Sequence, residues 1–254
     1  MNVTTRPEFE IRLADGQDDI RAAQALRYRV FVNELGGDGA QVDHETGLER
    51  DDFDAHCDHL LLIDKAAGDA VVGVYRLLQR AGAKAAGQFY SESEYDLTPL
   101  LNSGRNLLEL GRSCLDPAYR GGAAMHHLWQ GLAQYVEDNE IEILFGVASF
   151  HGTDAEALAE PLSLLYHRHS APEELRTRAV AYQPMNLMPA EQIDRRRAML
   201  QVPALIKAYL RLGGFVGDGA YVDHAFNTID VCLIMDAERM CAARKNIYSR
   251  EVAE

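Results

Sequence analysis

The chain has 254 residues, of which 47% are hydrophobic and 25% charged, the balance of an ordinary globular protein. Its formal net charge of −14 at pH 7 excludes a general nucleic-acid-binding protein, because such a protein needs a basic surface to neutralise phosphates. The apolar runs are too short for a transmembrane helix, and the opening MNVTTRPEFEIRLAD lacks the apolar region of a secretion signal. We therefore expect a cytoplasmic protein.

The first hundred residues mix strands, helices and loops. The predicted elements, in chain order, are a strand over Phe9–Leu13, a helix over Gln17–Glu34, a long acidic loop over 38–58, a hairpin of His59–Asp64 with Ala70–Leu78, and an irregular stretch over 80–106 with short helical pieces. The helix ends at a run of glycines, and the hairpin closes near Gly68. A loop as long as the acidic one usually carries function.

The segment Leu107–Trp129 contains an apolar strand, a glycine-rich turn that begins at Arg120, and an amphipathic helix. Gly121 and Gly122 let an anion approach the backbone where the helix starts, and the first amides of a helix lack partners. The segment therefore predicts a phosphate-binding turn. It is not a P-loop, which needs Lys and then Ser or Thr after its glycines, nor a G-x-G-x-x-G dinucleotide motif.

The remaining predicted elements continue the alternation. They are a strand over Ile143–Ser149, a helix that starts at a capping box of Thr153 and Glu156 and runs toward His169 with a kink or restart at Pro161, a strand over Arg178–Gln183, a helix over Pro203–Leu212, a strand over Thr228–Met235, and a last helix from Asp236 to about Tyr248. Interleaved strands and helices without repeats predict one mixed α/β domain over 1–254, with a basic helical insertion near 184–214.

Glu109 and Arg112 interrupt the apolar run of the central strand. Ionisable groups are costly inside a sheet unless they are paired or lie at a site, so both are candidate site residues. A structural ion pair is the alternative for the two. Cys114 follows closely, but no base is spaced to activate it as a nucleophile.

The four cysteines, Cys57, Cys114, Cys232 and Cys241, show no C-x-x-C spacing, so we expect reduced thiols and neither a zinc site nor a disulfide framework. The cluster DAHCDH over Asp54–His59 contains metal-ligand types at spacings that fit no common site. We therefore predict no bound metal.

A basic segment contrasts with the acidic chain. Residues 171–211 carry seven basic and four acidic side chains. An acidic partner or anionic lipid fits such a surface, while simple solvated helix charges are the alternative. The residues that we expect at a peripheral contact with the inner membrane are Arg195, Arg196, Arg197, Lys207 and Arg211.

With these motifs, the chain resembles the GNAT-related N-acyltransferases over most of its length. The resemblance implies an α/β fold with a central mixed sheet flanked by helices and a C-terminal elaboration. One similar branch is the acyl-homoserine-lactone synthases, whose ordered pattern of Arg, Phe, two Asp, Arg and E-x-x-R appears here as Arg27, Phe31, Asp51, Asp54, Arg76, Glu109 and Arg112. Those synthases carry a Trp where this chain has Gly37. Because that Trp is associated with their S-adenosylmethionine, a different amine acceptor is expected.

The second branch is the ornithine N-alpha-acyltransferases. The strings that resemble it are RYRVFVNELG, ELGRSCLDPAYRGG, SFHGTD and LIKAYLRLGGFVGDGAYVDHAFNTIDV, the last of which the lactone synthases lack. The resemblance implies transfer of a 3-hydroxyacyl chain from acyl carrier protein to the α-amino group of L-ornithine, giving a lyso-ornithine lipid. It further implies no bound cofactor, with the 4′-phosphopantetheine thioester as co-substrate. The turn departs from the usual GNAT pattern at Ala123 and Met125, which favours a single phosphodiester over the diphosphate of coenzyme A.

The resemblance also implies roles for residues. Glu109 is the expected base, and Arg112 orients it or holds the acceptor carboxylate. The expected acyl-pantetheine-binding residues are Cys114, Leu115, Arg120, Gly121, Gly122 and Ala123, with a backbone amide near the first two meeting the oxyanion. The expected acceptor-binding residues are Arg27, Phe31, Glu34, Asp51, Asp54 and Arg76, although core packing is the stronger expectation for Phe31. Asp51, Asp54 or Glu34 would hold the side-chain ammonium of ornithine. The alternatives are an autoinducer synthase, another N-acyl amino acid synthase, or a non-enzymatic acyl or carrier-protein binding module.

Overall fold

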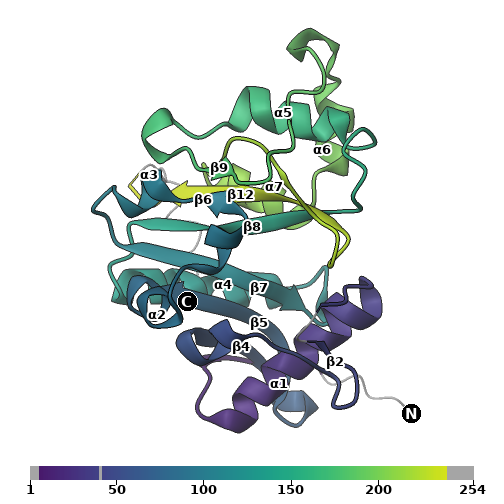
Figure 1. Cartoon of the computed structure of the whole chain (residues 1–254). Helices are drawn as coiled ribbons and strands as arrows, with labels where there is room; N and C mark the ends of the chain where they lie inside the picture. The colour runs from purple at the N-terminus through teal and green to yellow at the C-terminus, as the bar shows by residue number, and fades with distance from the viewer. Residues whose placement is uncertain (1–5, 40–41, 239–254) are drawn as a thin grey trace, which may run out of the picture. The chain divides into compact units, whose positions relative to one another are not determined.

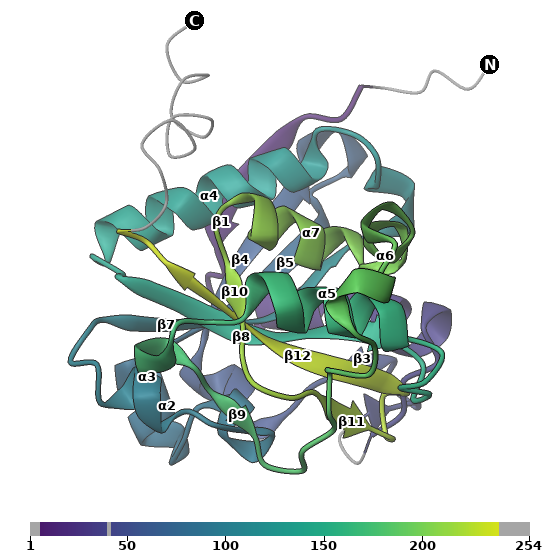
Figure 2. The ribbon, with the colours of Figure 1, turned by 90° about the horizontal axis from the view of Figure 1, so that it is seen from above.

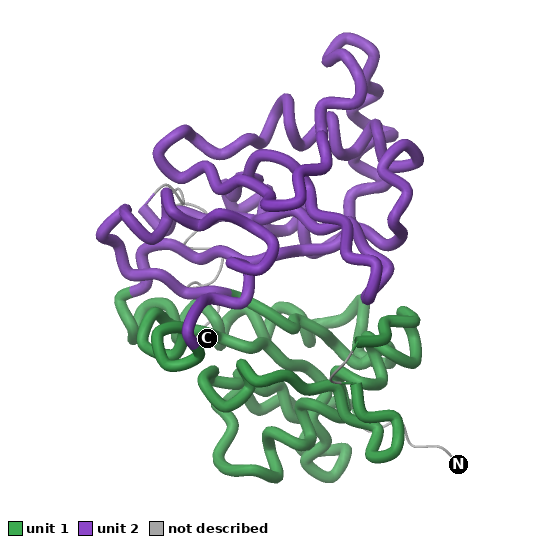
Figure 3. Tube along the Cα trace, in the orientation of Figure 1, with its two compact units in different colours: residues 1–86, 110–140 green, residues 87–109, 141–254 purple. Residues whose placement is uncertain are grey.

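The structure is a computed structural model that describes residues 6–39 and 42–238 (Figure 1). The chain divides into two compact units, the first formed by Met1–Ala86 with Leu110–Glu140 and the second by Gly87–Glu109 with Ile141–Glu254 (Figure 3). Strand β7, Leu107–Leu115, runs through both, because the division falls between Glu109 and Leu110.

The first unit contains a strand order β1-β4-β5-β7, in which β1 with β4 and β4 with β5 pair antiparallel. Its elements are β1 (Phe9–Leu13), α1 (Gln17–Arg27), the π-helix η1 (Tyr28–Glu34), β2 (Val42–Asp43), β3 (Leu48–Glu49), the 3-10 helix η2 (Asp52–His56), β4 (Asp58–Asp64), η3 (Lys65–Ala67), β5 (Ala70–Gln79), α2 (Arg80–Ala86), η5 (Pro117–Tyr119) and α4 (Ala124–Asp138). The hairpin of β2 with β3 stands apart from the main sheet.

Two helices, α1 and α4, cover opposite faces of this sheet. Neighbouring residues on a strand point to opposite faces, so a single strand can contact both helices. Leu61 of β4 packs with Leu26 of α1 in a buried apolar cluster, while Leu60 faces α4. A side chain at Gly131 of α4 would collide with Ile11 of β1, so glycine permits this close approach. β4 is therefore buried on both faces and reads as a continuous apolar run.

The second unit contains the strand order β7-β8-β12-β10, with β11 also paired to β12. Its further elements are η4 (Tyr90–Ser93), β6 (Tyr95–Asp96), α3 (Thr98–Leu101), β8 (Ile143–His151), α5 (Ala159–His169), η6 (Glu173–Leu175), β9 (Arg178–Ala179), η7 (Ala190–Gln192), α6 (Arg195–Gln201), α7 (Ala204–Arg211), β10 (Phe215–Val216), β11 (Tyr221–Asp223) and β12 (Thr228–Asp236). β7 and β8 are parallel, whereas β8 and β12 are antiparallel, so the sheet is mixed. Helix α7 packs on β12 and α5 on β10 (Figure 2).

The predicted strands correspond closely to β1, β4, β5, β7, β8 and β12, which confirms the mixed α/β class. The helix predicted over Gln17–Glu34 is continuous, but its last seven residues are wound as a π-helix. Two predicted helices, one in the glycine-turn unit and one over Pro203–Leu212, are confirmed as α4 and α7. Among the described residues, no helix combines the length and the apolar composition needed to cross a membrane.

Two local predictions in the second unit need correction. The capping box at Thr153 is absent, because Asp154 Oδ1 accepts the backbone N–H groups of Glu156 and Ala157. These residues form a turn, and α5 begins after it at Ala159. Pro161 then falls in the first turn of the helix, where it is tolerated. The strand predicted over Arg178–Gln183 reduces to the two residues of β9, with single bridges from Arg178 to Asp218 and from Gln183 to Ala220.

The stretch expected to be irregular before β7 contains the unpredicted α2, whose alanines favour a helix. The last predicted helix lies almost entirely outside the described residues, as does Cys241.

Candidate functional site

Strand β7 carries the two ionisable residues that the sequence singles out. Arg112 has a φ of 51°, in the left-handed region that residues with a side chain adopt rarely. A left-handed residue interrupts the regular alternation of side chains along a strand. The three-residue spacing from Glu109 therefore does not tell on which face of the sheet the Arg112 side chain lies. The contacts described below for Glu109 lie within the second unit, and those for Arg112 lie within the first.

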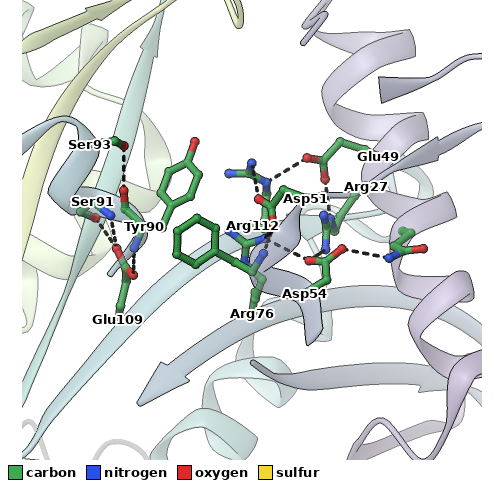
Figure 4. Close-up of polar contacts among 12 residues, drawn as sticks. Arg27, Glu49, Asp51, Asp54, Arg76, Tyr90, Ser91, Ser93, Glu109 and Arg112 are labelled. Carbon is green, nitrogen blue, oxygen red and sulfur yellow. Dashed lines mark hydrogen bonds and ion pairs between the residues drawn. The ribbon is translucent and has the colours of Figure 1, made fainter. Parts of the chain in front are cut away.

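The carboxylate of Glu109 is buried and accepts hydrogen bonds from the start of η4 (Figure 4). The backbone N–H of Tyr90 donates to Oε2 over 2.8 Å and that of Ser91 to Oε1 over 2.7 Å. The Ser91 hydroxyl also donates to Oε1. A short helix starts with unpaired N–H groups, so an acidic side chain is well placed there. These three donors fix the direction of the carboxylate.

Six charged side chains of the first unit form a closed network of ion pairs, which we call the ion ring (Figure 4). They alternate in sign, and each pairs with the two beside it. In order around the ring they are Arg27, Glu49, Arg112, Asp51, Arg76 and Asp54. Three cations and three anions make the ring neutral.

One part of the ring joins β3 and the start of η2 to β7. Glu49 accepts from Arg27 Nε over 2.5 Å and from Arg112 Nε over 3.0 Å. Asp51 accepts from Arg112 Nη2 over 3.1 Å and from Arg76 Nη1 over 2.5 Å. Asp51 also caps η2, because its Oδ1 accepts the backbone N–H of Phe53.

Asp54 closes the ring. Its Oδ1 accepts from Arg27 Nη1 over 2.7 Å and from Arg76 Nη1 over 3.0 Å. Its Oδ2 accepts from the side-chain amide of Gln24 over 2.9 Å, and its backbone oxygen lies 3.0 Å from Nε2 of the buried His59. The ring therefore ties α1 and the acidic loop to the sheet.

Burial and ion pairing act in opposite directions on the ring carboxylates. Burial raises the pKa of Asp54, but the charges of Arg27 and Arg76 outweigh it and hold the pKa below its ordinary value. The pKa of Glu49 is likewise lowered against the effect of burial, by Arg112 and Arg27. The ring is thus ionised at neutral pH, and its members compensate one another's desolvation.

Glu49 was missed by sequence reasoning. It belongs to no motif that we compared, and it follows a buried Leu48 in a short hairpin that sequence patterns predict as loop. The available signal was charge balance, since the ring holds three arginines and the sequence pattern supplied only Asp51 and Asp54 as acids in that region.

The predicted acceptor-binding residues fall into three groups. Four of them lie in the ion ring, namely Arg27, Asp51, Asp54 and Arg76. Phe31 packs against the apolar cluster around Leu26, as core packing predicts. Glu34, at the end of η1, pairs with Arg120. Within the ring, the side chain of Arg27 is fully buried, while those of Asp51 and Arg112 are 12% and 14% exposed.

The predicted phosphate turn lies between η5 and α4. Gly121 has a φ of 77°, which glycine adopts without strain. The N-cap of α4 is Ala123, which makes no side-chain capping hydrogen bond, and the first amides of a helix have no partner within the helix. Arg120 donates to Glu34 through both terminal nitrogens and to the backbone oxygen of Leu115.

The cysteine beside this turn is not an activated nucleophile. Cys114 is buried in the apolar cluster, and burial raises the pKa of its thiol to about 12. The reactive thiolate is therefore scarce at neutral pH. Within the described part of the chain, no group of three or more His, Cys, Asp or Glu side chains is arranged to hold a metal ion.

The predicted basic surface is only partly available. Arg197 pairs with Glu160 of α5 through Nε and Nη2, over 2.6 and 2.8 Å. Arg195 and Arg196 are exposed on α6, and the Leu200 side chain on the same helix is 75% exposed. Lys207 is half-buried and Arg211 exposed on α7.

Comparison with known proteins identifies relatives along nearly the whole chain. An acetyltransferase (GNAT) domain model matches residues 26–130. An L-ornithine N(alpha)-acyltransferase of Rhodobacter capsulatus is 58% identical over 248 residues, covering 96% of each chain. A protein of the same name from Brucella abortus is 42% identical over 251 residues, covering 96% of this chain and 89% of that one.

Two solved structures share the fold at low sequence identity. An N-acyl amino acid synthase from uncultured soil microbes has a TM-score of 0.56 and 10% identity, covering 95% of this chain and 99% of that one. A CoA-dependent acyl-homoserine lactone synthase has a TM-score of 0.56 and 13% identity, covering 96% and 90%. The GNAT fold and the two full-length relatives lead to one assignment: the chain is an N-acyltransferase and belongs to the L-ornithine N(alpha)-acyltransferase family.

Proposed function

We propose that this protein transfers a 3-hydroxyacyl chain from acyl carrier protein to the α-amino group of L-ornithine, giving a lyso-ornithine lipid. The observation that carries the proposal is the 58% identity with the Rhodobacter capsulatus L-ornithine N(alpha)-acyltransferase over 96% of both chains. The reaction forms an amide bond between the amine nitrogen and the thioester carbonyl carbon. The carbon–sulfur bond breaks, and the carrier thiol leaves with a proton.

In this proposal, the turn before α4 holds the phosphate of the donor. The uncapped first amides of α4 and the backbone at Gly121 and Gly122 offer N–H groups to one phosphodiester. A backbone amide near Cys114 and Leu115 meets the oxyanion of the tetrahedral intermediate, where developing charge needs a fixed donor. No cofactor takes part, since the carrier thioester supplies the activated acyl group.

The acceptor is recognised by the most exposed edge of the ion ring. Arg112 and Asp51 are adjacent there, with Arg112 Nη2 3.1 Å from Asp51 Oδ2. Ornithine carries an α-carboxylate and a side-chain ammonium, and it is complementary to such a pair. Arg112 binds the carboxylate, which a guanidinium matches with two hydrogen bonds, and Asp51 binds the ammonium. The other ring members hold these two side chains in position.

Glu109 takes the proton that the ornithine α-ammonium must lose before the amine attacks. A general base must be held in a fixed direction to act efficiently, and the three donors from Tyr90 and Ser91 fix this carboxylate. The proton passes directly or through a water molecule.

The test is a product assay with purified protein. It is incubated with 3-hydroxyacyl carrier protein and, separately, with ornithine, lysine, glutamine and S-adenosylmethionine, and products are identified by mass. Acylated ornithine is expected. A homoserine lactone product would assign an autoinducer synthase instead, and the absence of any product with a correctly folded protein would favour a binding module.

We also propose peripheral contact with anionic lipid through the exposed residues of α6. The acyl product is an amphiphile, and basic side chains next to an exposed apolar one are typical of a membrane surface contact. Arg195, Arg196 and Leu200 form this contact, while Arg197 is engaged with Glu160. Lys207 and Arg211 on α7 add charge to it.

A further inference from the structure

Glu34 and Arg120 form a two-pronged ion pair at the turn that precedes α4. Nη1 of Arg120 donates to Oε1 of Glu34 over 2.5 Å, and Nη2 donates to Oε2 over 2.7 Å. The backbone oxygen of Leu115 accepts from Nε and Nη2 over 3.3 and 3.2 Å. These contacts use four of the five N–H groups of the guanidinium. Arg120 is thus already bound to an anion of the protein itself.

A second ion pair joins the same two segments. Arg29 lies 3.5 Å from Asp116, which precedes η5. Arg29 and Glu34 are five residues apart in η1, and the i to i+5 winding of a π-helix brings such residues toward one face. The π-helix therefore presents one cation and one anion to the segment from Asp116 to Arg120, where Asp116 pairs with the cation and Arg120 with the anion. Together these four side chains carry no net charge.

The pair remains charged at neutral pH. The hydrogen bonds from Arg120 hold the pKa of Glu34 below its ordinary value. Both side chains are partly exposed, 43% for Arg120 and 34% for Glu34, so a ligand at the turn reaches them from solvent. An incoming phosphate competes with Glu34 for Arg120 and is repelled by the Glu34 carboxylate.

That competition depends on the charge of the donor. The pantetheine of a carrier protein is joined through one phosphodiester with a single negative charge. Coenzyme A carries a diphosphate and a further phosphate on its ribose. Because Coulomb repulsion grows in proportion to charge, a fixed carboxylate disfavours coenzyme A more strongly.

We propose that Glu34 is a donor-specificity residue: by neutralising Arg120, it disfavours acyl-coenzyme A relative to acyl carrier protein. The inference rests on the proposed function, because it takes this turn as the phosphate site. It also gives Glu34 a role different from the ammonium binding that the sequence suggests.

The experiment compares kcat/KM for one 3-hydroxyacyl chain on carrier protein and on coenzyme A. Glu34→Gln is expected to raise the coenzyme A value relative to the carrier-protein value by about tenfold, because the freed Arg120 cation attracts the more highly charged donor more strongly at short range. Glu34→Ala provides a second variant that breaks the same pair, and melting temperatures confirm that each is folded. In the double variant Glu34→Gln with Arg120→Gln, the gain disappears because the released cation is gone.

Asp69→Asn is the matched control, since it makes the same change of net charge at an exposed pair with Lys65. It should leave the ratio unchanged. A constant ratio in both folded Glu34 variants would overturn the inference, and a raised KM for ornithine with that constant ratio would return Glu34 to ammonium binding. If the parent protein acylates ornithine from neither donor, the proposed function fails instead.

Discussion

Replacing Glu49 by Gln tests whether the ion ring holds the first unit together. Glu49 is 2% exposed and bridges Arg27, which is fully buried, to Arg112. The amide keeps one oxygen to accept from one arginine, but its NH2 group faces the donors of the other. The substitution therefore leaves a buried guanidinium with a reduced counter-charge.

The expected loss in the free energy of unfolding is about 3 kcal/mol. Removing one partner of a buried ion pair costs about 3–5 kcal/mol. The lower end applies because Arg27 keeps its pair with Asp54 and the amide retains one acceptor. Such a loss is large against the roughly 5–15 kcal/mol that stabilises a typical domain.

Urea unfolding gives the measurement, followed by the fluorescence of the single tryptophan, Trp129. Trp129 lies in α4 of the same unit, and its Nε1 is 3.3 Å from the hydroxyl of the buried Tyr75. Asp69→Asn removes a carboxylate from an exposed pair and should cost about 0.5 kcal/mol or less. If Glu49→Gln costs less than about 1 kcal/mol, the ring is not a stabilising unit.

Three further outcomes follow from the contacts described. The ring carboxylates have pKa values below those of the unfolded chain, so the stability that they contribute is complete above about pH 4 and is lost as the pH falls through their folded pKa values. Glu49→Gln should therefore make the free energy of unfolding depend less steeply on pH on the acid side. An unchanged slope would contradict this. Glu109→Gln should lower kcat about 100-fold. Ser91→Ala removes one hydrogen-bond donor but keeps the carboxylate, so it should lower kcat less than about tenfold. Near-parental turnover of Glu109→Gln would exclude Glu109 as the base. The double variant Arg195→Gln with Arg196→Gln should no longer float with anionic liposomes. Arg197→Gln should still float, because Glu160 already pairs with that side chain. Loss of flotation in Arg197→Gln alone, with flotation retained in the double variant, would refute the assigned surface.

Local patterns of the sequence suffice for most of the fold. Alternating or continuous apolar runs predict β1, β4, β5, β8 and β12, and the spacing of apolar residues predicts α1 and α4. These elements depend on periodicity, which each segment carries by itself. The capping box at Thr153 fails because Asp154, one residue later, competes for the same backbone groups.

The candidate site divides in the same way. The sequence by itself determines that Glu109 and Arg112 are exceptional, because an ionisable residue in an apolar strand needs a reason, and resemblance to relatives supplies Arg27, Asp51, Asp54 and Arg76. Only the tertiary structure decides their partners. Ion pairs such as Arg27 with Glu49 join segments far apart in the chain, and no local pattern encodes which charges will meet.

The pairing of Glu34 with Arg120 is the clearest case. Sequence reasoning assigns one residue to the acceptor amine and the other to the donor phosphate. The structure brings them together, because two ion pairs join the π-helical end of the first helix to the segment from Asp116 to Arg120. The sequence determines which chemistries are present, and the folded backbone decides which of these charges are available to a ligand and which are neutralised within the protein.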